Sequence, residues 1–233
     1  MGKITVKHYL NTSVQPEIIN NINHYPVYIR ITINRKSTQY RSITGHKLSE
    51  NDFNNYINGN NYSCDFSKYG IFDKEYFENE PIRIQKAFEF FINQCAFEQF
   101  NKRRFDFIWS WISGVFLMWT ENGLINFMWG YTITSIDKEK MYSIFNKECS
   151  LVECLKNLNK YFGVDIKSQI HPIDMEVWEN TELLLKHINK KNIFIDFVCN
   201  YREIIGKIKG IKNKENFIAI IKEVTEKFYE YSW

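Results

Sequence analysis

Two stretches near the N-terminus alternate between apolar and polar residues, and this alternation limits the fold more than any other feature. Residues 2–8 (GKITVKH) place Ile4 and Val6 on one side, and residues 25–33 (YPVYIRITI) place four β-branched residues on one side. A period of two is typical of a strand that buries one face. A polar turn (NRK) and a return strand at residues 37–44 follow. The sequence therefore predicts a small three-stranded sheet.

The apolar face of such a thin sheet needs a cover. The sequence offers residues 16–23 (PEIINNIN) or a short helix at residues 49–58, where Ser49 and Asp52 form a variant of the capping box. Residues 58–70 (NGNNYSCDFSKYG) are polar and rich in turn formers, which indicates a linker. We therefore expect a first domain over residues 1–60 and a second over residues 70–233.

The charge of the chain is unevenly distributed. The first 47 residues hold seven Lys and Arg side chains and one acid, Glu17, for a net +6, whereas the other 186 residues hold 23 basic and 26 acidic side chains, for a net −3. This asymmetry predicts an anionic partner for the N-terminal end. A sheet with basic and polar residues on one face can enter the DNA major groove. The candidate DNA-binding residues are Lys3, Thr5, Lys7, Tyr28, Arg30, Thr32, Arg35, Lys36, Gln39 and Arg41.

Within this set, the side-chain chemistry suggests two roles. Arg30 and Arg41 could read guanine or grip phosphate, and the other basic residues are more suited to phosphate contacts. The alternative is a solvated sheet face, because edge strands carry Lys to block aggregation.

The N-terminal pattern resembles a known domain. The basic first strand, the hairpin YPVYIRITINRK and the return strand TQYRS are similar to the N-terminal arm-type DNA-binding domain of tyrosine recombinase integrases, as carried by phages and conjugative transposons. The likeness covers residues 1–47. It implies a three-stranded sheet followed by a helix, with the sheet in the major groove of arm sites that flank the recombination core.

The catalytic part of that family is absent from the sequence. Strand exchange requires an HxxR motif, and the residues three places after the five histidines are Asn11, Val27, Ser49, Asp174 and Lys190. A length of 233 residues is also short for arm, core-binding and catalytic domains together. Phosphate-binding loops, HExxH and CxxC spacings are absent too. We therefore expect no enzyme activity, no cofactor and no metal site.

The remainder of the chain is predicted to be mainly helical, so that the fold class is α+β. A helix begins at Pro81 and extends to residue 101, followed by a basic cluster, Lys102 to Arg104, that would lie at the C-terminal end of that helix. The uncharged run at residues 107–120 is shorter than the ~20 residues of a membrane span. We interpret it as a buried element, such as a β-hairpin turning at residues 121–123. The tryptophans of this region, which extends through a second uncharged run at residues 124–136, are expected in the core, although they could stack on single-stranded bases: Trp109, Trp111, Trp119 and Trp129.

Further helices are predicted at residues 137–148, 150–162, 172–191 and 193–209, and a last one opens at Asn213. A basic patch lies between the last two. The leading hypothesis is a cytoplasmic accessory or regulatory protein of a mobile element that binds double-stranded DNA. An integrase or another protein is a further expected partner, and a homo-oligomer is left open. The alternatives are a protein-interaction module without a DNA role, and an enzyme with an unrecognised site in the helical domain.

Overall fold

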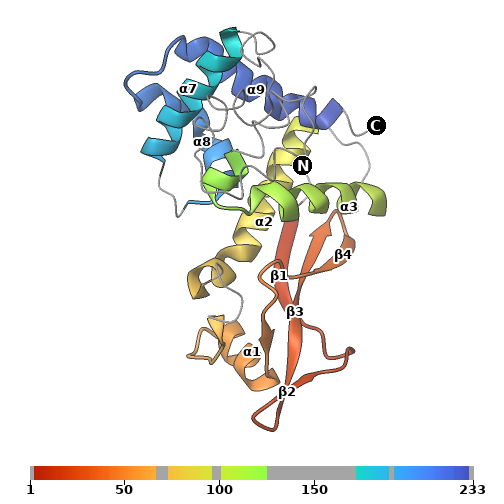
Figure 1. Cartoon of the computed structure of the whole chain (residues 1–233). Coiled ribbons are helices and arrows are strands. Elements are labelled where there is room, and N and C mark those ends of the chain that lie inside the picture. Colours follow the sequence, from red (N-terminus) through yellow and green to blue (C-terminus); the bar gives the residue numbers. More distant parts are fainter. Residues whose placement is uncertain (1–2, 67–72, 96–100, 125–171, 189–191, 231–233) are drawn as a thin grey trace, which may run out of the picture. The chain divides into compact units, whose positions relative to one another are not determined.

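The computed structural model describes residues 3–66, 73–95, 101–124, 172–188 and 192–230. Figure 1 shows an antiparallel sheet near the N-terminus followed by helices, so the fold is α+β, as the sequence predicts. The chain forms two compact units, Met1–Gly114 and Val115–Trp233. Each unit has its own buried apolar residues.

The sheet is built around one long strand, β3 (Ile22–Ile33). Strands β1 (Ile4–Leu10) and β4 (Lys36–Arg41) pair antiparallel with its second half. Two short strands, β2 (Glu17–Ile19) and β5 (Lys47–Leu48), pair with its first half. The three strands predicted from the alternation are therefore present, and β2 and β5 extend the sheet (Figure 1).

One face of the sheet is buried. Val27, Ile29 and Ile31 on β3 have no exposed surface, and Ile4 and Val6 on β1 are also buried. Helix α2 (Lys74–Cys95) packs against β1 and contributes a buried apolar stripe. The stripe is formed by Phe77, Ile84, Ala87, Phe88 and Phe91.

The cover of this face differs from the sequence prediction. The segment at residues 16–23 forms the β2–β3 hairpin, and its Ile18 and Ile22 side chains are 69% and 53% exposed, so it does not shield the sheet. Helix α1 (Glu50–Ile57) begins after Ser49 as predicted, since the Ser49 hydroxyl accepts from the Asp52 amide at 3.1 Å. Helix α1 covers part of this face, because its Phe53 and Tyr56 pack against the buried cluster that includes Val27. The buried stripe of α2 packs against β1 and adds a cover that was not predicted from the sequence.

Helix α2 begins earlier than the proline suggests. The Asp73 carboxylate accepts from the Tyr76 amide at 2.8 Å and starts the helix, which leaves Pro81 in its interior. Helix α3 (Lys102–Trp111) then begins at Asn101, whose side chain accepts from the Arg104 amide. The basic cluster at residues 102–104 therefore lies at the N-terminal end of α3, not at the C-terminal end of the preceding helix.

The two compact units divide the chain after Gly114, whereas the sequence predicts domains over residues 1–60 and 70–233. Because α2 and α3 bond to the sheet, the first compact unit extends to Gly114 rather than ending between residues 60 and 70. The apolar run is mainly helical: α3 continues into a π-helical turn, η2 (Ile112–Phe116), and residues 120–124 are helical again. Residues 107–124 therefore do not form the first strand and turn of the expected β-hairpin, and its second strand lies outside the described residues. None of the helices in the described part of the chain combines the length and apolar character needed to traverse a bilayer.

The described part of the second unit includes the helices α7 (Pro172–His187), α8 (Phe194–Lys207) and α9 (Lys214–Glu230), which are close to their predicted bounds. Buried Asn180 on α7 binds both backbone groups of Lys212, accepting from its amide at 3.0 Å and donating to its carbonyl at 2.9 Å. The helices predicted at residues 137–148 and 150–162, and Trp129, lie outside the described residues.

Candidate nucleic-acid interface

The face of the sheet opposite the buried residues collects most of the predicted DNA-binding residues. The strand register aligns them in three rows, each with one residue from β1, one from β3 and one from β4. The rows are Thr5–Thr32–Ser37, Lys7–Arg30–Gln39 and Tyr9–Tyr28–Arg41. Lys7, Arg30, Gln39 and Arg41 are exposed, so a ligand can reach this side of the sheet. We call this surface the open face.

Two predicted residues lie at its border and one lies elsewhere. Lys3 directly precedes β1, and Arg35 occupies the turn between β3 and β4. Lys36 is the first residue of β4 and pairs with buried Ile33. The alternation therefore places Lys36 on the side of the sheet opposite the open face. The three rows also include Tyr9 and Ser37, which were not among the predicted site residues. Tyr9 was missed because the first strand was expected to end at His8, whereas β1 continues to Leu10.

Arg30 is held in place at the centre of the open face. Its guanidinium carbon lies 4.9 Å from the centroid of the Tyr9 ring, a cation–π distance. The Gln39 amide can form hydrogen bonds with both Arg30 and Tyr9 when its oxygen faces Arg30 and its nitrogen faces Tyr9. The oxygen then accepts from Arg30 Nε at 3.2 Å and Nη2 at 2.9 Å, and the nitrogen donates to Tyr9 Oη at 2.5 Å. One Arg, one Tyr and one Gln from three strands thus form a single cluster.

The electrostatics of the open face are cationic. Glu17 is the one acid among the first 49 residues, and its carboxylate accepts from Lys47 Nζ at 2.7 Å. Burial raises the pKa of Tyr9, while the charge of Arg30 opposes this rise, so the Tyr9 hydroxyl stays protonated at neutral pH. The five cations Lys3, Lys7, Arg30, Arg35 and Arg41 therefore share a surface with neutral partners.

The turn that carries Arg35 has a backbone conformation that is unfavourable for an arginine. Asn34 and Arg35 have φ angles of +49° and +65°, which indicates a two-residue hairpin turn of type I′. Asn tolerates the left-handed region, and Gly is the usual second residue, because a Cβ costs ~1 kcal/mol there. Arg at this position is therefore unfavourable for the turn itself.

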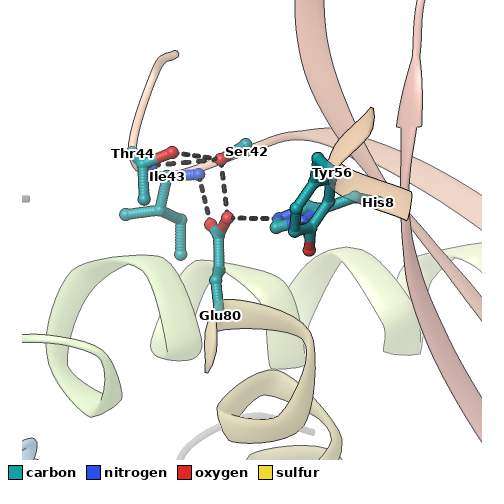
Figure 2. A network of polar contacts seen from close by, with 6 residues as sticks. All are labelled: His8, Ser42, Ile43, Thr44, Tyr56 and Glu80. Carbon is teal, nitrogen blue, oxygen red and sulfur yellow. Dashed lines mark hydrogen bonds and ion pairs between the residues drawn. The ribbon is translucent and has the colours of Figure 1, made fainter. Parts of the chain in front are cut away.

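A buried polar network fixes the sheet to α2 behind the open face (Figure 2). The fully buried Glu80 carboxylate accepts from the Ser42 hydroxyl at 2.7 Å and from the Ile43 amide at 2.7 Å, and it lies 2.8 Å from His8 Nε2. His8 Nδ1 lies 2.8 Å from the Tyr56 hydroxyl. These bonds join β1 and the segment after β4 to one helix. They therefore position both outer strands of the open face.

Helix α3 supports β4 from the buried side. The Tyr40 hydroxyl donates to Asp106 at 2.8 Å, and the Tyr40 ring stacks on Trp109 at 4.4 Å between centroids. Hydrogen bonds from Lys102 and then from Tyr40 hold the pKa of Asp106 below its usual value. Trp109 thus contacts β4, but Trp109, Trp111 and Trp119 are only half-buried and are not part of the fully buried core that the sequence predicts for them.

Within the described part of the chain, no group of three or more His, Cys, Asp or Glu side chains could hold a metal ion. No family model, no curated protein and no solved structure matches this chain. The resemblance of residues 1–47 to an integrase arm-type domain therefore stays a prediction.

Proposed function

We propose that the protein binds double-stranded DNA, with the open face of its sheet in the major groove. The observation that carries this proposal is the gathering of Lys3, Lys7, Arg30, Arg35 and Arg41 on or beside one sheet face. Charges that act together in this way attract phosphates and produce a steep dependence of affinity on salt.

The dimensions of the open face fit the groove. Neighbouring strands lie ~4.8 Å apart, so β1 and β4 are separated by about 10 Å, against a groove width of ~12 Å. The central strand then lies over the base edges, and the outer strands approach the two phosphate backbones. Lys7 on β1 and Arg41 on β4 are therefore suited to phosphates.

The turn residue gives independent support. Gly would be less strained than Arg35 at a φ of +65°. Residues that break a local conformational rule are often found at functional sites. A phosphate contact from the tip of the β3–β4 hairpin is a physical reason for an Arg at this position.

The biological setting rests on the resemblance alone. It suggests an accessory or regulatory protein of a mobile element that acts beside an integrase and performs no strand exchange itself. The second compact unit would then provide the contact with a protein partner or a second copy.

The proposal is tested by fluorescence anisotropy of the full chain on a pool of duplex DNA across a salt titration. With about four phosphate contacts, log Kd should rise with log salt concentration with a slope near 4. Arg30→Ala with Arg41→Ala should weaken binding by about 2–6 kcal/mol if each side chain contributes 1–3.

The matched control is Lys207→Ala with Lys209→Ala, which removes the same charge from exposed positions of the second unit. This control should bind DNA almost as the unchanged protein does. Equal losses in the two double variants would mean that net charge, not the open face, drives binding. Absence of binding at low salt would refute the proposal.

A further inference from the structure

We infer that Arg30 reads a guanine in the major groove and that Tyr9 and Gln39 are its positioning residues. This inference rests on the proposed function and assigns base recognition to one of the five cations. From the residue type alone, Arg30 and Arg41 could each read a guanine or bind a phosphate. The inference assigns the guanine to Arg30 and not to Arg41.

The guanidinium group of Arg30 retains a pair of N–H donors that is suited to guanine. Arg has five N–H donors, and Gln39 occupies one on Nε and one on Nη2, which form one edge of the group. The three remaining donors have no partner among the described residues. They include one N–H on each terminal nitrogen at the far end of the group, and this pair matches the O6 and N7 acceptors of guanine.

Arg30 lies at the centre of the open face. Lys7 and Gln39 flank it in the middle row, and β3 is the middle strand of the open face. A side chain at this point faces the groove floor, whereas side chains on β1 and β4 face the walls. Arg41 is exposed on β4, and the described residues provide no cation–π or amide contact to it.

The Arg30 side chain is ordered before DNA binds. Contact with the Tyr9 ring and two bonds to Gln39 restrict Arg30 before DNA arrives. A restricted side chain loses less conformational entropy on binding than a free one, and its direction is fixed. Such pre-organisation is useful for base discrimination and unnecessary for a phosphate contact, which tolerates many geometries.

The first experiment selects duplexes from a random-sequence pool with the full-length protein and with two variants. We expect the unchanged protein to enrich sites with one invariant guanine. Arg30→Lys keeps the charge but loses the two-pronged donor pair, so the preference at that base pair should disappear. Arg41→Ala should bind more weakly and keep the preference.

The second experiment changes single atoms of the selected guanine. Replacement by 7-deazaguanine removes N7 and should weaken binding of the unchanged protein by roughly 5- to 150-fold. Inosine, which keeps O6 and N7 and lacks only the minor-groove amine, should bind almost equally. In the Arg30→Lys variant, 7-deazaguanine should reduce the affinity much less, because this variant already lacks the two-pronged contact with guanine.

The third experiment tests the positioning role of Tyr9. Tyr9→Phe keeps the ring under Arg30 and removes the hydroxyl that binds Gln39. Discrimination between guanine and 7-deazaguanine should fall several-fold, while the salt dependence of binding to random duplex stays the same. A purely structural role for Tyr9 would not change this discrimination, and urea unfolding checks that the variants remain folded.

The outcomes separate the inference from the proposed function. Salt-sensitive binding without any base preference, or equal losses on all sequences in Arg30→Lys, would overturn the guanine assignment and leave DNA binding intact. An invariant guanine that is insensitive to Arg30→Lys would also overturn it. If the protein does not bind DNA, both the guanine assignment and the proposed function are refuted.

Discussion

Glu80 is a fully buried acid in the first unit. An unpaired buried carboxylate is very unfavourable, but Glu80 is stabilised by a hydroxyl, a backbone amide and an imidazole. With its proton on Nε2, His8 can donate to Glu80 and accept from the Tyr56 hydroxyl. Each donor thus has a matched acceptor.

Replacing Glu80 by Ala should lower the free energy of unfolding by about 3–5 kcal/mol, because several buried donors lose their acceptor. Glu80→Gln should cost less, since His8 can change tautomer and accept from the amide. Urea unfolding measures both. The control is Glu89→Ala on the same helix, where the partner, Gln85, lies one turn away and the expected loss is below about 1 kcal/mol. Equal losses at Glu80 and Glu89 would contradict this account.

Tyr56 makes the first unit sensitive to alkaline pH. Burial, and then the charges of Glu78 and Glu80, raise the pKa of Tyr56 from 10.0 to about 12. The fold therefore favours the neutral phenol, and this contribution is complete below pH 10 and is lost as the pH rises toward 12.

We expect the unfolding free energy of Tyr56→Phe to fall less steeply between these pH values than that of the unchanged protein. The difference is at most ~1.4 kcal/mol per pH unit, and smaller because the phenol is partly exposed. Urea titrations at a series of pH values measure both slopes, and the other tyrosines cancel in the comparison. Parallel curves would show that Tyr56 titrates normally.

At the scale of elements, Arg35 gives the β3–β4 turn a positive charge but makes it less stable than Gly would at the same position. Arg35→Gly should stabilise the protein by about 0.5–1 kcal/mol, because Gly adopts the left-handed region without strain. It should also reduce the slope of log affinity against log salt by about 0.9, the value for one lost phosphate contact. Asn34→Gly in the same turn is the control, since it removes no charge. An unchanged salt slope in Arg35→Gly would exclude the phosphate contact.

Two helical glycines in the second unit differ in the space around them. A Cβ on Gly123 would lie 2.5 Å from Phe194 Cβ, whereas a Cβ on Gly206 would meet nothing within 4 Å. Gly123→Ala should therefore destabilise the protein by about 1–3 kcal/mol through overpacking. Gly206→Ala in α8 should stabilise it by up to about 1 kcal/mol through helix propensity. Thermal unfolding measures the change in melting temperature of each variant, and equal changes in the two variants would contradict this packing.

At the scale of the whole molecule, the first compact unit needs α2 and α3 as well as the sheet. A fragment of residues 1–114 should unfold cooperatively in urea, because it keeps Glu80, the apolar stripe of α2 and the Tyr40 contacts of α3. A fragment of residues 1–60 should not, since its buried isoleucines would be exposed on one side. Dispersion of amide proton resonances gives a second readout. Cooperative unfolding of residues 1–60 would contradict the boundary at Gly114.

The helical apolar run shows where the sequence is ambiguous. Residues 107–120 lack charges and have no clear period, and a buried helix and a buried strand cannot be separated by periodicity in that case. Pro81 was misleading for a related reason. Proline is common in the first turn of a helix, but the tertiary contacts of Glu80 and Phe77 stabilise a helix that starts at Lys74.

The sequence alone determined the sheet, the separation of its two faces and the excess of positive charge on one of them. These properties follow from a side-chain period of two, which depends only on the local backbone. The tertiary structure decided which helix covers the sheet and which residues hold Arg30. Those contacts join residue 8 to residue 80, and residue 9 to residues 30 and 39. Strand register and helix packing set such distances, and no local pattern in the chain encodes them.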